Sequence, residues 1–178
     1  LSGCLTFSDI KLEKVSIKMS QSNCEDAVHF VRVSGVGVDL DVNQSLSDSV
    51  DADFSDIEFG NVKINGAGND CVDLSAGGYV IRAATMANCA DKGISVGEKS
   101  SVKVDELFIN VAGIGVAGKD SSEVSLDRFS INDVDFCFAA YQKKVNYFGG
   151  VINLKKGECT DSHIAKVFKQ KGSIVSSY

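Results

Sequence analysis

The chain has 178 residues, a formal net charge of −6 and 44% hydrophobic residues, which is the composition of one folded domain and excludes a disordered or fibrous chain. No apolar run approaches the roughly 18 residues that a membrane-spanning helix needs. Pro and Trp are absent and Gly is plentiful at 17, which disfavours a helical bundle and favours many short strands joined by turns.

The first residues, Leu1-Ser2-Gly3-Cys4, resemble a lipoprotein cleavage box without the charged and apolar segment that belongs before one. We therefore expect the chain to be the C-terminal part of a longer protein.

From residue 28 onward, apolar residues return at steps of 22 positions. One file reads Val28, Val50, Val72, Ile94, Val116 and Phe138, and the file two residues later reads Phe30, Ala52, Leu74, Val96, Gly118 and Ala140. Alternation at this spacing marks a strand with one face turned inward. A unit of 22 residues cannot bury that face alone and needs an equivalent strand above and below, at about 4.8 Å. The repeat therefore predicts a parallel β-solenoid of six to seven coils, with Asn88, Asn110 and Asn132 stacked at one turn.

Further inward files include Val36, Val80, Val102 and Val124, then Val38, Val104, Leu126 and Phe148. Glu58 and Arg82 interrupt this pattern, which indicates slips or bulges of one residue. The repeat breaks down after Tyr147, and Thr160 falls where the next core residue is expected. We assign residues 1–150 to the solenoid and residues 151–178 to an irregular last coil or cap.

Three segments carry a resemblance to a known family. Asp-Cys-Val-Asp-Leu-Ser (70–75), Asn-Cys-Ala-Asp-Lys-Gly-Ile-Ser-Val (88–96) and Gly-Ile-Gly-Val (113–116) resemble the repeats of the pectate-lyase-like superfamily. The resemblance implies an all-β chain folded as a right-handed single-stranded parallel β-helix, in an extracellular or cell-surface protein. That superfamily includes lyases, hydrolases, epimerases, phage tailspikes and non-catalytic surface proteins, so the resemblance leaves activity open.

Residues between the inward positions are expected on the outer face of the same strands. They include Asp51 and Asp53 of one strand and Asp73 one coil later. Neighbours on adjacent coils are expected about 5 Å apart, so these carboxylates should raise one another's pKa. Such a trio suits Ca²⁺ binding, or acid–base work in a polysaccharide lyase or glycoside hydrolase. Lys119 is the candidate base of a lyase, although coil counting puts it roughly 10 Å or more from Asp73. Outward residues kept polar for solubility are the competing interpretation.

The same outer face supplies further candidates for substrate binding: His29, Arg32, Glu98, Asp120, Tyr141 and Lys143. His29 and Arg32 are expected to neutralise part of the acidic trio. A second acidic file of Asp26, Asp48 and Asp70 continues as Lys92, and its carboxylates are interpreted as acceptors for backbone N–H groups. His163 is interpreted as a surface or cap residue.

Six cysteines show no metal-finger spacing. Cys137 and Cys159 share one phase of the repeat and come within disulfide reach if the register holds, but burial as small hydrophobic residues is favoured. The cysteines therefore leave the cellular compartment open.

Residues 1–140 carry 11 basic and 22 acidic side chains, whereas residues 141–178 carry 7 basic and 2 acidic ones. The acidic body argues against nucleic acid as a partner. Two functions remain. The first is an extracellular domain that binds, and in an enzyme cleaves, an acidic polysaccharide on its outer sheet face. The alternative is a non-catalytic structural or adhesive segment of a larger surface protein, associating end to end through open strand edges.

Overall fold

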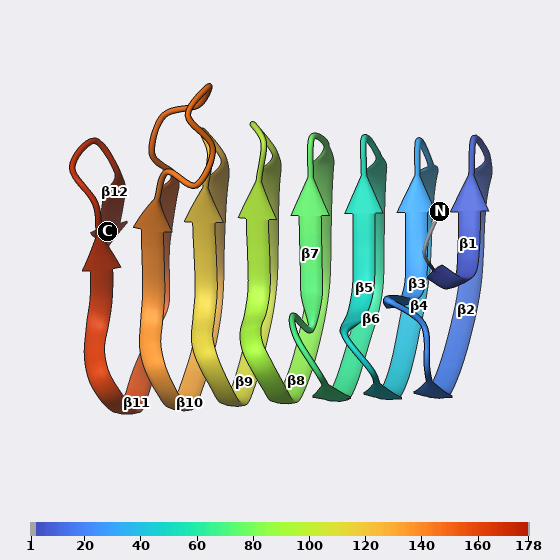
Figure 1. Ribbon diagram of the computed structural model, residues 1–178, viewed down its shortest axis with the longest axis horizontal. Coiled ribbons are helices and arrows are strands. Elements are labelled where there is room, and N and C mark those ends of the chain that lie inside the picture. The colour runs from blue at the N-terminus through green and yellow to red at the C-terminus, as the bar shows by residue number, and fades with distance from the viewer. Residues whose placement is uncertain (1–2, 178) are drawn as a thin grey trace.

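The computed structural model describes residues 3–177, and over this range the chain forms twelve strands wound into a parallel β-solenoid (Figure 1). The predicted all-β solenoid with coils of about 22 residues is confirmed, and about eight coils are present where six to seven were expected. The strands are β1 (Gly3–Ser8), β2 (Lys11–Ser22), β3 (Asp26–Val31), β4 (Ser34–Ser45), β5 (Asp48–Asp53), β6 (Asp56–Ala67), β7 (Val72–Ser75), β8 (Gly78–Gly97), β9 (Ser101–Lys119), β10 (Glu123–Tyr141), β11 (Val151–Lys169) and β12 (Ile174–Ser177).

Each coil crosses two parallel sheets. The front sheet consists of β1, β3, β5, β7 and the C-terminal segments of β8 to β11. The back sheet consists of β2, β4, β6, the N-terminal segments of β8 to β11, and β12. In the N-terminal coils a break separates the two segments at the lower corner, whereas from β8 to β11 one strand runs through that corner (Figure 1).

The inward file of the front sheet has the predicted register. Val50 pairs with Val72, Val72 with Ile94 and Ile94 with Val116, and all four side chains are buried. The position of a residue within the 22-residue repeat therefore predicts whether its side chain points into or out of the solenoid on this sheet. It does so less well on the back sheet, where Val36 pairs with Glu58 in a register shift and is exposed. The predicted slip is confirmed, and the expectation that Val36 lies inside is wrong.

The corners repeat as regularly as the strands. Residues with positive φ recur at the upper corner, including Arg32, Phe54 and Glu98, and at the lower corner, including Asn88 and Val111. This left-handed conformation turns the chain sharply between the two sheets and is unfavourable for a β-branched residue such as Val111.

A longer connection, residues 142–150, replaces the two-to-three-residue upper corner between β10 and β11. Phe148, expected in the core, lies exposed in this loop. Beyond it, β11 pairs with β10 with one register shift, and β12 pairs with Val151–Leu154. These strands make up most of the segment 151–178 that the repeat analysis set apart. No helix within residues 3–177 is long and apolar enough to cross a membrane.

Three disulfides lie near the lower corner, where the chain passes from the back sheet to the front sheet: Cys4–Cys24, Cys71–Cys89 and Cys137–Cys159. The interpretation of the cysteines as small buried hydrophobic residues is therefore wrong. Cys137 and Cys159 are bonded, but the register of 22 on which their predicted proximity depended does not hold, because Cys159 pairs with Ile131. Disulfides are typical of proteins in oxidising compartments. Leu1 and Ser2 of the lipoprotein-like segment lie outside the described residues, and Cys4 of that segment is bound to Cys24.

Candidate functional site

One outward-facing residue from each strand of the front sheet contributes to a file along the outer face of that sheet. Thr6, His29, Asp51, Asp73, Ser95, Ala117, Ala139 and Phe168 are consecutive partners in this file. The file passes from imidazole and carboxyl groups, through small residues, to an aromatic ring. The candidate site is built along it.

At the N-terminal end, His29 lies among three carboxylates. Its Nε2 is 3.2 Å from Asp53 Oδ2 and 3.6 Å from Asp51 Oδ2, while its Nδ1 is 3.6 Å from Asp26 Oδ2. His29 and Asp26 are buried, whereas Asp51 and Asp53 are partly exposed. Asp26 was expected only as a backbone acceptor, and its approach to His29 adds a residue that the sequence analysis did not place here.

Crowding of like charges has an electrostatic consequence at Asp51. Burial, together with the carboxylates of Asp53, Asp26, Asp73 and Asp48, raises the pKa of Asp51 to about 8. The predicted mutual effect of the carboxylates is thus confirmed at Asp51. At neutral pH this group holds either a proton or another cation.

Further along the sheet, Asp73 is paired with a lysine two coils away. Lys119 Nζ lies 3.6 Å from Asp73 Oδ1 and donates a hydrogen bond to Ser95 Oγ at 2.7 Å. The expected separation of 10 Å or more is wrong for these atoms, because the buried lysine side chain lies along the solenoid axis and crosses the intervening coil. Asp73 and Lys119 therefore belong to one site.

The second acidic file forms a ladder through backbone groups. The N–H of Asp70 donates to Asp48 Oδ1 at 2.8 Å, and the N–H of Lys92 donates to Asp70 Oδ1 at 3.1 Å. Lys92 Nζ also donates to Asp70 and contacts Asp91. Burial opposes the charged form of Lys92, but these carboxylates raise its pKa, so it stays charged. The predicted carboxylate–backbone bonds are confirmed for Asp48 and Asp70, and they run between coils.

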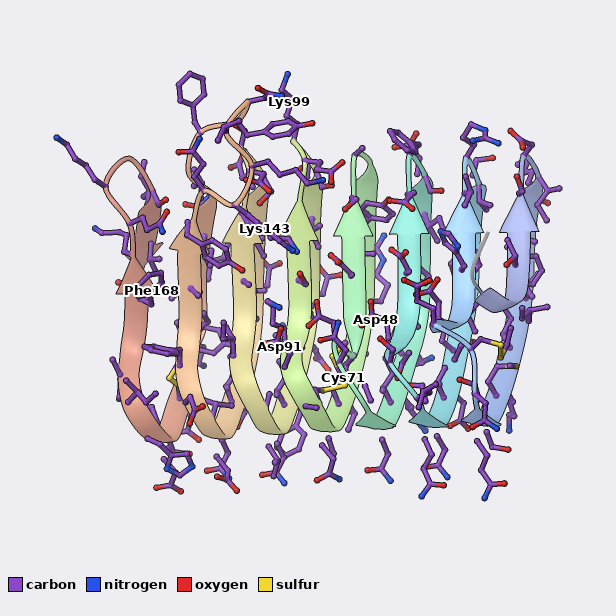
Figure 2. The ribbon with its side chains drawn as sticks, viewed as in Figure 1. Asp48, Cys71, Asp91, Lys99, Lys143 and Phe168 are labelled. Atoms are coloured by element: carbon purple, nitrogen blue, oxygen red, sulfur yellow. A yellow bond between two sulfur atoms is a disulfide. The ribbon has the colours of Figure 1, made fainter. Side chains whose placement is uncertain are left out.

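An apolar depression of about 250 Å³ lies at the C-terminal end of the same face and is lined by Ile114, Phe136, Ala139, Tyr141 and Phe168. The rings of Tyr141 and Phe168 meet edge to face, with centroids 6.3 Å apart. Figure 2 shows Phe168 at this end of the solenoid. Of the predicted binding residues, Tyr141 lies here.

His29 lies among the carboxylates described above, and the remaining predicted binding residues lie at the upper corner (Figure 2 labels Lys143 there). Arg32 is bound to Asp9, with its Nε 2.6 Å from Asp9 Oδ1, and does not neutralise the acidic trio as expected. Glu98 pairs with Lys144. Asp120 is buried and accepts the backbone N–H groups of residues 143 and 144 at 2.7 Å each, which fastens the 142–150 loop. The contacts of these residues hold the upper corner together, and the residues are not members of the outward file.

Potential metal ligands meet at one point within residues 3–177. One ligand atom each from Asp26, His29 and Asp51 lies within 4.8 Å of the others. The calcium site expected at Asp51, Asp53 and Asp73 shares one residue with this group, and Asp73 is turned toward Lys119.

Comparisons with protein families, with curated proteins and with solved structures find no match to this chain. The fold and the side chains themselves therefore carry the functional argument.

Proposed function

We propose that the chain is an extracellular, carbohydrate-associated domain of the pectate-lyase-like type that binds an extended polysaccharide along the outer face of its front sheet. The observation that carries the proposal is the file of outward residues, in which carboxylates and a lysine lie at one end and an apolar depression at the other. Sites for small and extended ligands combine apolar surface with a few polar groups that fix orientation.

The spacing of the file supports an extended ligand. Asp73 and Phe168 are four coils apart, roughly 19 Å at the usual strand spacing of about 4.8 Å. Between them, Ser95, Ala117 and Ala139 are small and buried, so the two ends of the file supply the contacts to the ligand. A chain of sugars lying along the solenoid axis can then place an apolar ring face on Tyr141 or Phe168 and hydroxyl groups near the charged end.

The three disulfides support an extracellular location, because such bonds persist where thiols are not kept reduced. Together with the resemblance of the coil motifs to pectate-lyase-like repeats, they favour secreted polysaccharide as the ligand class over an intracellular polymer.

The test is binding of a soluble polyuronate and of a neutral β-glucan, measured by calorimetry on the whole chain. Tyr141→Ala with Phe168→Ala should weaken binding about tenfold by removing the apolar contact. The matched control is Phe108→Ala, which removes a similarly exposed ring from the back sheet (45% exposed, against 41% for Phe168). Equal affinities of all variants, or no binding of either polymer, contradict the proposal.

The charged end is tested separately with Asp51→Asn, Asp53→Asn and Asp73→Asn combined. Its control combines Asp41→Asn, Asp105→Asn and Asp127→Asn, which changes the charge equally on the back sheet. Release of new reducing or unsaturated sugar ends by the wild type, lost only in the first variant, assigns cleavage to the trio. Unchanged binding and release in the first variant contradict this placement.

A structural role has its own supporting observation. Within the described residues, β12 covers only Val151–Leu154 of β11, so the outer edge of residues 155–169 has no strand beside it. This segment also exposes Ile164, Val167 and Phe168. Open strand edges pair with other strands, and a second copy stacking end to end is the alternative we retain. Light scattering over a concentration series decides it, because a strict monomer excludes assembly through this edge.

A further inference from the structure

His29 is a buried imidazole whose orientation is fixed from one side. It is 6% exposed, and its Nε2 lies 3.2 Å from Asp53 Oδ2, within hydrogen-bond distance. A carboxylate accepts hydrogen bonds, so Nε2 is the nitrogen that carries the proton in this contact. In the neutral form of the ring, Nδ1 then presents a lone pair.

Nδ1 is buried and has no hydrogen-bond partner within residues 3–177. Asp26 Oδ2 lies 3.6 Å from it, too far for a hydrogen bond. A nitrogen lone pair and a carboxylate oxygen thus face each other in a buried place. Two electron-pair donors in this arrangement are stabilised by a cation between them.

The spacing fits a metal ion. Transition ions bind imidazole nitrogen and carboxylate oxygen at about 2.0–2.2 Å, and a tetrahedral angle then holds the two donor atoms about 3.4 Å apart. The distance from Nδ1 to Asp26 Oδ2 is close to this value. One ligand atom each from Asp26, His29 and Asp51 lies within 4.8 Å of the others, and the partly exposed carboxylate of Asp51, 3.6 Å from Nε2, leaves a route for an ion from solvent.

The partners of the ring match a recurrent arrangement at metal sites. A histidine ligand usually donates its second ring N–H to a carboxylate, which fixes the tautomer and the direction of the lone pair. Asp53 stands in that position relative to His29. The nearby basic side chains are paired with carboxylates other than the three proposed ligands: Arg32 with Asp9, and Lys119 with Asp73.

We propose that Asp26, His29 and Asp51 bind one divalent first-row transition ion through a single imidazole nitrogen and two carboxylates, and that Asp53 is the positioning residue of the imidazole. Imidazole favours such ions over Ca²⁺, so this site differs in ligands and in metal class from the calcium trio expected from the sequence. The inference does not rest on polysaccharide binding.

The test is calorimetric titration of the chelator-treated chain with Zn²⁺ alone. One ion per chain is expected, and His29→Gln should weaken binding at least about tenfold. The matched control is His163→Gln, because the chain has two histidines and His163 forms an exposed pair with Asp133 at 2.6 Å. The cysteines do not compete, since the described chain has no free thiol.

A second measurement keeps the test valid if His29→Gln folds poorly. In the wild type, ¹⁵N NMR of the two imidazoles should show His29 protonated at Nε2, and Zn²⁺ should shift Nδ1 while the Nε2 proton is retained. Asp53→Ala should abolish the tautomer preference and weaken Zn²⁺ binding about tenfold, and Asp53→Asn should restore part of both. A Zn²⁺ shift confined to His163, equal binding by His29→Gln and wild type, or Ca²⁺ binding as tightly as Zn²⁺ overturns the proposal.

Discussion

The outer faces of the two sheets carry charge in opposite ways. On the back sheet, charges of opposite sign alternate between neighbouring strands: Arg82 lies within 3.0 Å of both Glu58 and Asp105, and Lys103 pairs with Asp105 and Asp127. On the front sheet, aspartates stand beside aspartates. The same fold thus accommodates alternating charges on one face and crowded carboxylates on the other, which is the face that we propose binds a ligand.

The comparison predicts that a cation on the front face matters more to stability than one on the back. Lys119 is buried, and its removal in Lys119→Met leaves Asp73 Oδ1 buried without a counter-charge. We expect a loss of about 3 kcal/mol in the free energy of unfolding, measured by urea denaturation with the disulfides intact. Adding Asp73→Asn should restore most of it.

The control on the back sheet is Arg82→Met, which breaks two exposed ion pairs and should cost less than about 1 kcal/mol. Equal losses in Lys119→Met and Arg82→Met contradict the distinction between the two faces.

The two faces should also differ in their dependence on pH. The pKa of Asp51 is raised to about 8, so its folded-state proton stabilises the protein at low pH, and this contribution is lost as the pH rises from about 4 to about 8. On the back sheet, hydrogen bonds from Lys103 and Arg82 lower the pKa of Asp105, so its contribution is present above about pH 4 and is lost as the pH falls below that value.

Asp51→Asn in chelator-treated protein measures the front-face effect. The variant should lose less stability than the wild type between pH 4 and pH 8, a difference of a few kcal/mol. The matched variant Asp105→Asn should leave that window unchanged. Parallel curves for Asp51→Asn and the wild type would contradict the raised pKa.

The smallest expected change in stability comes from the lower corner, which joins the two sheets. Val111 adopts φ 65°, which is strained for a β-branched residue, and it is half-exposed. Val111→Asn should stabilise the chain by about 1 kcal/mol. Asn88 occupies the same corner one coil earlier with φ 58°, and Asn88→Val should destabilise by a similar amount. Thermal unfolding of both variants provides the measurement, and shifts of the same sign contradict the strain.

The sequence predicts the fold well because the period of 22 fixes which residues stack. Val72 and Ile94 are adjacent in space for the same reason that they are 22 positions apart. Coil counting follows backbone positions, however, and it misses the reach of a long side chain such as that of Lys119.

The disulfides likewise do not follow from the period of 22. Cys71 lies in the loop before β7 and Cys89 lies in β8, 18 residues later, so they share no phase of the repeat. Asp26 approaches His29 within one strand, across a short distance that depends on rotamers rather than on period. The Asn ladder is intermediate: Asn132 donates to Asn110 as predicted, whereas Asn88 donates to Asn65.

The 142–150 loop has a consequence for how such a chain changes over time. Nine residues replace a short upper corner, yet β10 and β11 keep their pairing on both sides of it. A coil therefore tolerates extra chain at this point, because both ends of the loop are anchored by neighbouring coils. New recognition surface can be grafted at any upper corner, one coil at a time, without redesign of the stacked interior.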